Sequence, residues 1–144
     1  MLQDIKTVEN ANAFNLATID IRNLRLRTFI GFNPEERVKK QDVVLNIRIS
    51  YRLNPSVLDD QVEGALNYKT ITKKVIRQVE EGRFLLLEKL VSDVLATCRS
   101  HPDVVHASVT IDKPHALRFA ESVSLTLEYH KDTNIQLTPL EKAS

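Results

Sequence analysis

The feature that most constrains the fold is a strict alternation of apolar and polar residues between positions 42 and 53. Alternate positions are apolar, namely Val43, Leu45, Ile47, Ile49, Tyr51 and Leu53. The positions between them carry mainly polar or charged side chains, among them Asp42, Asn46, Arg48, Ser50 and Arg52. A period of two residues predicts a β-strand with one buried face and one solvated face. The rest of the chain must therefore supply neighbouring strands and a layer that covers the apolar face.

Three other segments show the same alternation. Two of them follow the middle of the chain, with apolar residues at Val105, Ala107, Val109 and Ile111, and then at Phe119, Val123, Leu125, Leu127 and Tyr129. The third begins at Ile19, and its apolar residues change from odd to even positions around Asn23. Such a slip predicts a β-bulge. Arg22, Arg25 and Arg27 lie near the slip, and they form either a solvated face or a local patch that attracts anions.

The segment between the second and third strands has a helical period. Ile71, Val75, Ile76 and Val79 recur every three or four residues, with Asn67 as a candidate N-cap and Gly82 as a candidate stop. A second apolar stripe runs from Leu87 to Cys98 and ends before His101 and Pro102. Cys98 falls on that stripe, so we interpret it as a core residue and not as a nucleophile.

The predicted order is therefore β-β-α-α-β-β, an α+β fold whose antiparallel four-stranded sheet carries two helices on one face. Each of the two sheet edges must be shielded or paired with another chain. We expect residues 1–16 to form a flexible N-terminal arm, residues 17–130 to form one domain, and residues 131–144 to form a polar C-terminal tail.

Composition narrows the class of function. The formal net charge is +1 and aromatic residues make up 6%, which argues against a nucleic-acid-binding platform built on stacking. The three glycines form no phosphate-binding loop. The single cysteine forbids an intrachain disulfide, and no stretch resembles a signal peptide or membrane span, so we expect a cytoplasmic protein. His101 and His106 lack neighbouring ligand-type residues in the sequence, so we expect no metal site.

Several residues of chemical interest lie at the ends of the predicted elements. Pro114 stops the third strand because it has no N–H to donate, and Lys113, His115 and Arg118 surround that strand end. Glu36 lies in the loop after the first strand, Tyr68 opens the first helix, and Glu88 lies in the first turn of the second. Taken by itself, this spacing is equally typical of ordinary surface charges.

Four stretches add a more specific signal: IRNLRLRTFIGFNPEERVKKQDVVLNI (21–47), ALNYKTITKKVI (65–76), RFLLLEKLVSDVL (83–95) and IDKPHALRFAESVSLTL (111–127). In this order and at this spacing they resemble the dihydroneopterin aldolase family of tunnelling-fold (T-fold) pterin enzymes. The resemblance implies a T-fold pterin-binding domain that assembles into a homo-octamer, with active sites between subunits. It implies a small-molecule pterin as the partner, and no nucleic acid or membrane.

The resemblance also implies roles for individual residues. Glu88 would accept two parallel N–H bonds from the pterin ring, with Leu87 beside it, because an ionised carboxylate can accept a bidentate pair. Lys113 and Tyr68 would move protons, either of them being the base, and Glu36 would be the active-site loop glutamate. His115 and Arg118 are candidates for binding phosphate. No cofactor or metal would be needed, because the C6=N5 imine of a dihydropterin is itself an electron sink.

The variants LRLRTFIG, ALNY and KPHALR favour one branch of the family. That branch implies an isomerase that inverts C2′ of dihydroneopterin triphosphate by retro-aldol and aldol steps. The alternative is aldolase cleavage to 6-hydroxymethyl-7,8-dihydropterin and glycolaldehyde. A distant alternative is a non-catalytic nucleic-acid-binding module that uses the arginine-bearing strands.

Overall fold

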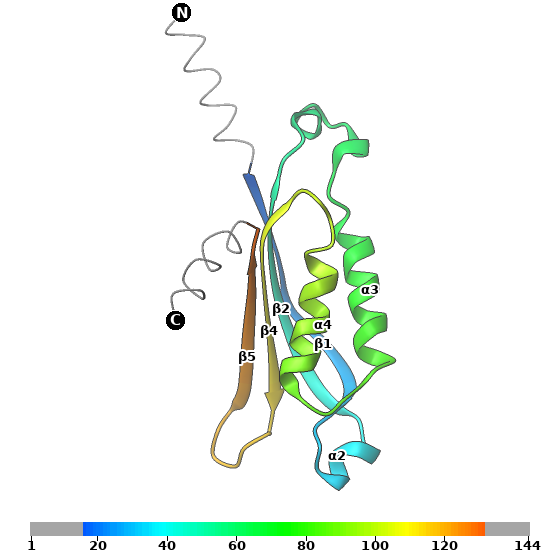
Figure 1. Ribbon diagram of the computed structural model, residues 1–144, viewed down its shortest axis with the longest axis vertical. Coiled ribbons are helices and arrows are strands. Elements are labelled where there is room, and N and C mark those ends of the chain that lie inside the picture. Colours follow the sequence, from blue (N-terminus) through cyan, green and yellow to red (C-terminus); the bar gives the residue numbers. More distant parts are fainter. Residues whose placement is uncertain (1–15, 132–144) are drawn as a thin grey trace, which may run out of the picture.

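A computed structural model describes residues 16–131 of the chain (Figure 1). The elements in order are β1 (Leu16–Ile30), α2 (Pro34–Val38), β2 (Gln41–Arg52), the 3-10 turns η1 (Pro55–Asp59) and η2 (Val62–Gly64), α3 (Tyr68–Glu80), β3 (Arg83–Phe84), α4 (Leu87–Cys98), β4 (Val104–Pro114) and β5 (Ser122–His130). The predicted arm and tail lie outside the described residues, apart from Leu16, which opens β1, and Lys131, which follows β5.

The sheet has the strand order β3-β1-β2-β4-β5, and its four long strands are antiparallel. The α+β class is confirmed, but the expected count of four strands is wrong. The fifth strand, β3, has only two residues and pairs in parallel with the end of β1. Two residues are too few to produce a periodic pattern, so the sequence could not reveal it.

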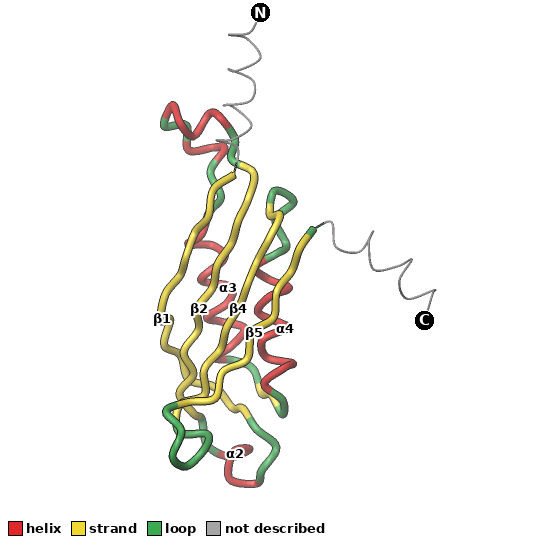
Figure 2. The backbone as a smooth tube through the Cα atoms, turned by 90° about the vertical axis from the view of Figure 1, so that its left-hand side faces the viewer, coloured by secondary structure: helices red, strands yellow, loops and turns green. Residues whose placement is uncertain are grey.

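Helices α3 and α4 lie side by side on one face of the sheet and leave the other face open (Figures 1 and 2). The core lies between the two layers. Residues Val43, Leu45, Ile47 and Ile49 of β2 are at most 2% exposed, and they meet fully buried helix residues, among them Val75, Val79, Leu90, Val91 and Val94. The alternation in β2 therefore marks the buried face of the sheet correctly.

The core position predicted for Cys98 is confirmed, because its side chain is fully buried. Burial in apolar surroundings raises the pKa of the Cys98 thiol to about 12. Nearly all of this thiol stays protonated at neutral pH, so it is not a nucleophile.

The predicted bulge at Asn23 is also confirmed. The β1–β2 register shifts between Ile21 and Leu24, and Asn23 has a φ of 54°. The Asn23 backbone N–H donates to Oδ1 of Asn46 on β2 at 3.0 Å, which satisfies the N–H that the bulge removes from the ladder. The bulge lets both halves of β1 turn their apolar side chains toward the helices.

The predicted helix start is confirmed, because Oδ1 of Asn67 accepts a hydrogen bond from the Thr70 backbone N–H at 3.1 Å. Two expectations need correction. The segment after β1 was expected to be a loop but contains the short helix α2, which Pro34 opens. Phe119 does not belong to β5: it lies in the preceding loop with a φ of 72° and is 98% exposed. None of the described helices is long and apolar enough to cross a membrane.

Candidate active site

A pocket of about 290 Å³ opens at the end of the sheet where α2 lies. Five segments meet there: the end of β1, α2, the start of α4, the end of β4 and the start of β5 (Figure 1). Apolar side chains form much of its lining, namely Ile30, Phe32, Leu85, Leu86, Leu87, Val123 and Leu125. Three charged side chains, Glu36, Glu88 and Lys113, line the same pocket. The pocket thus combines an apolar wall with a few polar groups, as small-molecule sites do.

Glu36 and Lys113 form an ion pair inside this pocket. Nζ of Lys113 donates to Oε2 of Glu36 at 2.7 Å, and the two side chains are 14% and 20% exposed, respectively. The residues are 77 positions apart in the sequence. Glu36 and Lys113 meet because α2 comes shortly after the end of β1, and β4 ends at that same end of the sheet.

Two further donors hold the Glu36 carboxylate. Nε2 of Gln41 donates to Oε2 at 3.1 Å, and the backbone N–H of Asn33 donates to Oε1 at 3.4 Å. The hydrogen bond from Lys113, and then that from Gln41, lower the pKa of Glu36 against the opposing effect of its burial. Glu36 is therefore an anion at neutral pH.

Gly31 makes room for this carboxylate. Its φ is 125°, a conformation that residues with a side chain rarely adopt, and a Cβ atom on it would collide with the carboxylate of Glu36. Its backbone N–H donates to the Phe84 carbonyl on β3 at 2.9 Å. Gly31 and Gln41 thus position Glu36, and sequence reasoning assigned neither of them to the site. The only signal for Gly31 is a glycine at a strand end, which is also typical of ordinary turns.

Glu88 lies in the first turn of α4, where the unpaired backbone N–H groups of the helix favour a negative charge. Leu87 precedes it and lines the same pocket. Four of the seven predicted site residues, Glu36, Leu87, Glu88 and Lys113, are therefore brought together within one chain. The carboxylate of Glu88 and the ammonium of Lys113 can both reach a molecule in the pocket, one as an acceptor and the other as a donor.

Tyr68 is not brought to this pocket within the chain. It is the first residue of α3, and its side chain is 49% exposed. The other end of α3 contacts the β1–β2 connection, where Nζ of Lys40 donates to the Glu80 carbonyl at 3.1 Å. A helix of 13 residues is about 20 Å long, so Tyr68 lies roughly that far from the pocket.

His115 and Arg118 also lie outside the pocket lining. His115 borders a separate hollow of about 460 Å³ that includes Arg25 and Arg27. The guanidinium of Arg118 lies 5.3 Å from the ring centre of the exposed Phe119. Nothing in these contacts assigns either residue a ligand.

Of the three arginines that offered either a solvated face or an anion-attracting patch, Arg22 and Arg27 form ion pairs, whereas Arg25 has no ion pair among the described residues. Arg27 donates to Oδ1 of Asp42 at 2.7 Å, and Arg48 donates to both carboxylate oxygens of Asp20, at 2.8 and 3.2 Å. Arg22 also contacts Asp20, at 3.5 Å. These arginines belong to a solvated face with paired charges, which leaves little free positive charge for nucleic acid.

The expectation that His106 lacks ligand-type neighbours is wrong. Its Nε2 lies 3.2 Å from Oε1 of Glu128, and the centre of its ring lies 4.4 Å from that of His130. All three residues lie on paired strands, and His106 is 22 positions before Glu128, farther than a short motif spans.

Comparison with known proteins identifies relatives of this fold and pocket. The profile of the dihydroneopterin aldolase family matches residues 19–128. The chain is 52% identical over 116 residues to a dihydroneopterin triphosphate 2′-epimerase of Pseudomonas aeruginosa, covering 81% of this chain and 94% of that protein. It is 50% identical to the Escherichia coli protein of the same name, covering 80% and 96%. The crystal structure of E. coli dihydroneopterin aldolase in complex with neopterin matches with a TM-score of 0.73 at 25% identity, covering 78% and 98%.

Proposed function

The chain belongs to the dihydroneopterin aldolase family, and we propose that it is an isomerase that inverts C2′ of 7,8-dihydroneopterin triphosphate to give 7,8-dihydromonapterin triphosphate. The observation that carries this proposal is the identity of 50–52% to two epimerases over nearly their whole length. The aldolase that binds neopterin shares only 25% of its residues with this chain. The pocket agrees with a reaction that needs a ring-binding carboxylate and a proton-transfer group.

The chemistry needs no net oxidant or reductant. A base removes the proton of the 2′-hydroxyl, C2′ becomes an aldehyde, and the C1′–C2′ bond breaks. The electron pair of that bond moves into the C6=N5 imine of the ring and leaves an enamine. If the aldehyde turns over and the enamine attacks its opposite face, the C1′–C2′ bond re-forms with C2′ inverted and the proton returns to oxygen. Release of the aldehyde before re-addition would instead give cleavage.

Glu88 is the residue we assign to the ring. The 2-amino-4-oxo-pyrimidine part of a pterin has two parallel N–H groups, and a carboxylate accepts both in a bidentate pair. Glu88 lies on a helix whose next residues are packed in the core, Leu90 and Val91 being fully buried. A rigid support of this kind keeps the carboxylate in place, so the ring would be held with its side chain directed at a defined part of the pocket.

Lys113 is the residue we assign to the 2′-hydroxyl proton: its neutral amine would accept that proton, directly or through a water molecule, and the ammonium so formed would return it to the oxygen. Its ammonium lies inside the pocket with one hydrogen bond to the ionised Glu36, and an ammonium can donate three. The free positions can contact a substrate hydroxyl and a developing alkoxide. Glu36 would orient the lysine and balance its charge, and Gln41 and Gly31 would keep Glu36 in place.

Tyr68 would complete the site from a second copy of the chain in a homo-octamer. It cannot reach Lys113 of its own chain across roughly 20 Å, whereas its half-exposed ring is available at the surface. Among the described strands, β5 pairs on one side only, with β4, so its other edge is open to a strand of another copy. Leu58 and Val62, in the turns before α3, are 67% and 76% exposed. These apolar surfaces support burial in an assembly.

A complementation experiment tests the shared site. Tyr68→Phe and Lys113→Met would each be inactive alone, and mixed oligomers formed by dissociation and reassembly would contain some sites with both native residues. A gain in activity on mixing supports the proposal. It would be overturned by hybrids, verified by mass spectrometry, that show no gain, or by sedimentation of a fully active monomer.

The triphosphate needs cationic partners, and one hollow adjoins the pocket. This hollow of about 560 Å³ shares Gly31, Glu36 and Leu85 with the pocket and contains Arg37 and Arg83. We favour these two arginines over His115 and Arg118, because the hollow that contains His115 shares no lining residue with the pocket. Arg83 keeps free N–H groups although its guanidinium stacks 3.9 Å from the ring centre of Phe29 and donates to the Arg37 carbonyl.

Paired substitutions separate the two sets of cations. Arg83→Met should raise KM for the triphosphorylated substrate about tenfold to a hundredfold, because a hydrogen bond to a charged group contributes roughly 1.5–3 kcal/mol. KM for dephosphorylated dihydroneopterin should stay within twofold. If Arg118→Met or His115→Ala instead raised KM for the triphosphorylated substrate alone, the triphosphate would be bound by those residues and not by Arg37 and Arg83.

The activity itself is tested by incubating the purified protein with dihydroneopterin triphosphate and resolving the two C2′ epimers by chiral chromatography. We expect interconversion from either epimer. The alternative function, an aldolase, predicts 6-hydroxymethyl-7,8-dihydropterin and a released aldehyde instead. Formation of these products without any epimer would overturn the proposal. We also propose a cytoplasmic setting, since the single buried thiol fits a reducing compartment.

A further inference from the structure

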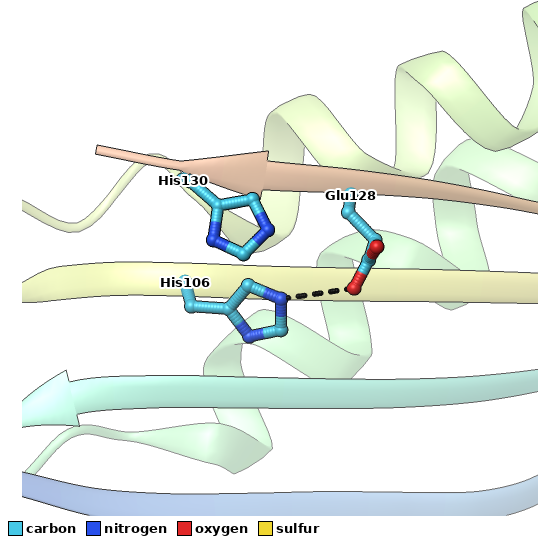
Figure 3. Close-up of side chains that lie close together, drawn as sticks. All are labelled: His106, Glu128 and His130. Carbon is cyan, nitrogen blue, oxygen red and sulfur yellow. Dashed lines mark hydrogen bonds and ion pairs between the residues drawn. The ribbon is translucent and has the colours of Figure 1, made fainter. Parts of the chain in front are cut away.

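Two histidines and one glutamate meet on the open face of the sheet, away from the pocket. They are His106 on β4 and Glu128 and His130 on β5, and one ligand atom from each lies within 4.8 Å of the others. Figure 3 shows both imidazoles and the carboxylate projecting from neighbouring strands on the side opposite the helices. Imidazole nitrogen and carboxylate oxygen are ligands that zinc and related divalent ions accept.

The strand register explains why these three side chains meet. His106 pairs directly with His130 across the β4–β5 ladder, and Glu128 is two residues before His130 in the sequence. Because side chains two residues apart in a strand share a face, all three point to the same side. The site is therefore built on two regular strands and not on a flexible loop.

One distance between ligand atoms already matches what a metal ion needs. Bonds of about 2.0–2.2 Å from zinc to nitrogen and oxygen place two ligand atoms of a tetrahedral ion roughly 3.3 Å apart. Nε2 of His106 lies 3.2 Å from Oε1 of Glu128. The two imidazole rings have centres 4.4 Å apart and are tilted by 38°, so a small rotation of His130 completes a three-ligand arrangement.

An ordinary hydrogen bond explains only part of this arrangement. The bond between His106 and Glu128 does not involve His130, whose ring faces that of His106 directly across the ladder. The two arginines of the surrounding hollow both pair with Asp20, Arg48 through two hydrogen bonds and Arg22 at 3.5 Å, and neither forms an ion pair with Glu128. A cation shared by the three side chains would give all three ligand atoms one common partner.

We propose that His106, Glu128 and His130 bind one divalent transition-metal ion, with zinc as its representative, at a structural site distinct from the active site. The hollow of about 360 Å³ beside His106 and Glu128 leaves space for water to complete the coordination. Along β4, His106 is seven residues from Lys113, a separation of roughly 23 Å, so the ion would lie far from the catalytic lysine of its own chain. Its effect would be to join the edge strand β5 to β4.

Zinc titration of untagged, metal-stripped protein tests this proposal. The four histidines of the chain are at positions 101, 106, 115 and 130, so His101→Ala serves as a matched control outside the cluster. We expect one zinc per chain in calorimetry, a higher Tm with zinc, and zinc in the crystal at the three ligand atoms, visible by anomalous scattering. His106→Ala, His130→Ala and Glu128→Gln should each weaken binding at least about tenfold.

The control variant should bind zinc as tightly as the native protein does. Circular dichroism would show that each variant remains folded. The absence of stoichiometric zinc binding would overturn the proposal. Equal binding by the native protein and the three cluster variants would also overturn it, because the zinc would then lie elsewhere.

Discussion

Replacing Lys113 with methionine removes the ammonium while keeping an unbranched side chain of similar length. If Lys113 moves the 2′-hydroxyl proton, kcat should fall about 10²–10⁴-fold, which is typical of a general acid–base group. At 1.36 kcal/mol per tenfold, the barrier rises by roughly 3–5 kcal/mol. Binding of a pterin should change little, because Glu88 and the apolar wall remain in place.

The structure also fixes the effect on stability. The substitution removes the 2.7 Å hydrogen bond to Glu36, and such a bond to a charged group contributes roughly 1.5–3 kcal/mol. Glu36 keeps its bonds from Gln41 and from the Asn33 backbone, so we expect a loss near the lower end of that range. The protein should therefore stay folded while it becomes inactive.

The stability difference should depend on pH in a defined direction. Lys113 is the largest cause of the lowered pKa of Glu36. A lowered folded-state pKa contributes stability above the ordinary value of 4.5, and this contribution is lost as the pH falls through the folded-state pKa. The native protein should therefore exceed the variant in stability at pH 7, and the gap should narrow below about pH 4.5.

Single-turnover kinetics, calorimetric titration of a pterin and urea unfolding at two pH values measure these effects. Lys131→Met is the matched control, since Nζ of Lys131 also donates to a protein oxygen, the Pro102 carbonyl at 3.0 Å, but just after the end of β5, away from the pocket. A Lys113→Met variant that turned over at the native rate would refute the assignment. A variant that lost pterin binding together with turnover would refute the division of roles between Lys113 and Glu88.

Three further outcomes are expected, two at the pocket and one at the proposed zinc site. Glu88→Ala should weaken pterin binding by roughly 1–3 kcal/mol, because the ring N–H groups lose their acceptor, and calorimetry that shows native affinity would contradict this. Gly31→Ala should lower kcat by displacing Glu36 while leaving the far-UV spectrum intact, and a fully active variant would show that the position of Glu36 is unimportant. Chelation should remove zinc from the proposed sheet-face site and leave the epimerisation rate within twofold, whereas activity lost to a chelator and restored by a divalent ion would mean that catalysis needs the metal.

The fold was largely predictable because the apolar residues of its main strands and helices recur at the period typical of each element. The alternation in β2 and β4, the slip at Asn23 and the apolar stripe of α4 each correspond to an element that the structure contains. The elements that were not predicted are too short to show a periodic pattern, because β3 has two residues and α2 has five. Phe119 was assigned to a strand because it lies at an odd-numbered position, like the apolar residues of β5, although it belongs to the preceding loop and has a positive φ.

The site was predictable only through the resemblance to a family, because its parts come from distant segments. No local pattern joins Glu36 to Lys113, 77 residues away, or identifies Gln41 as a partner of Glu36. The cluster of His106 and His130 escaped notice for the same reason, since it depends on the β4–β5 register. The fold of one chain leaves Tyr68 at the start of α3, away from the pocket, so its catalytic role stays a proposal that depends on a second copy.

The burial of Cys98 makes the protein convenient for site-specific labelling. It is the only cysteine of the chain, it is fully buried, and its thiol has a pKa of about 12, so a maleimide at neutral pH should leave it unmodified. A cysteine introduced at the 80% exposed Val38, at the end of α2, would then carry the only dye. Fluorescence from that dye would report, in the otherwise native enzyme, whether α2 moves when a pterin enters beside Glu36.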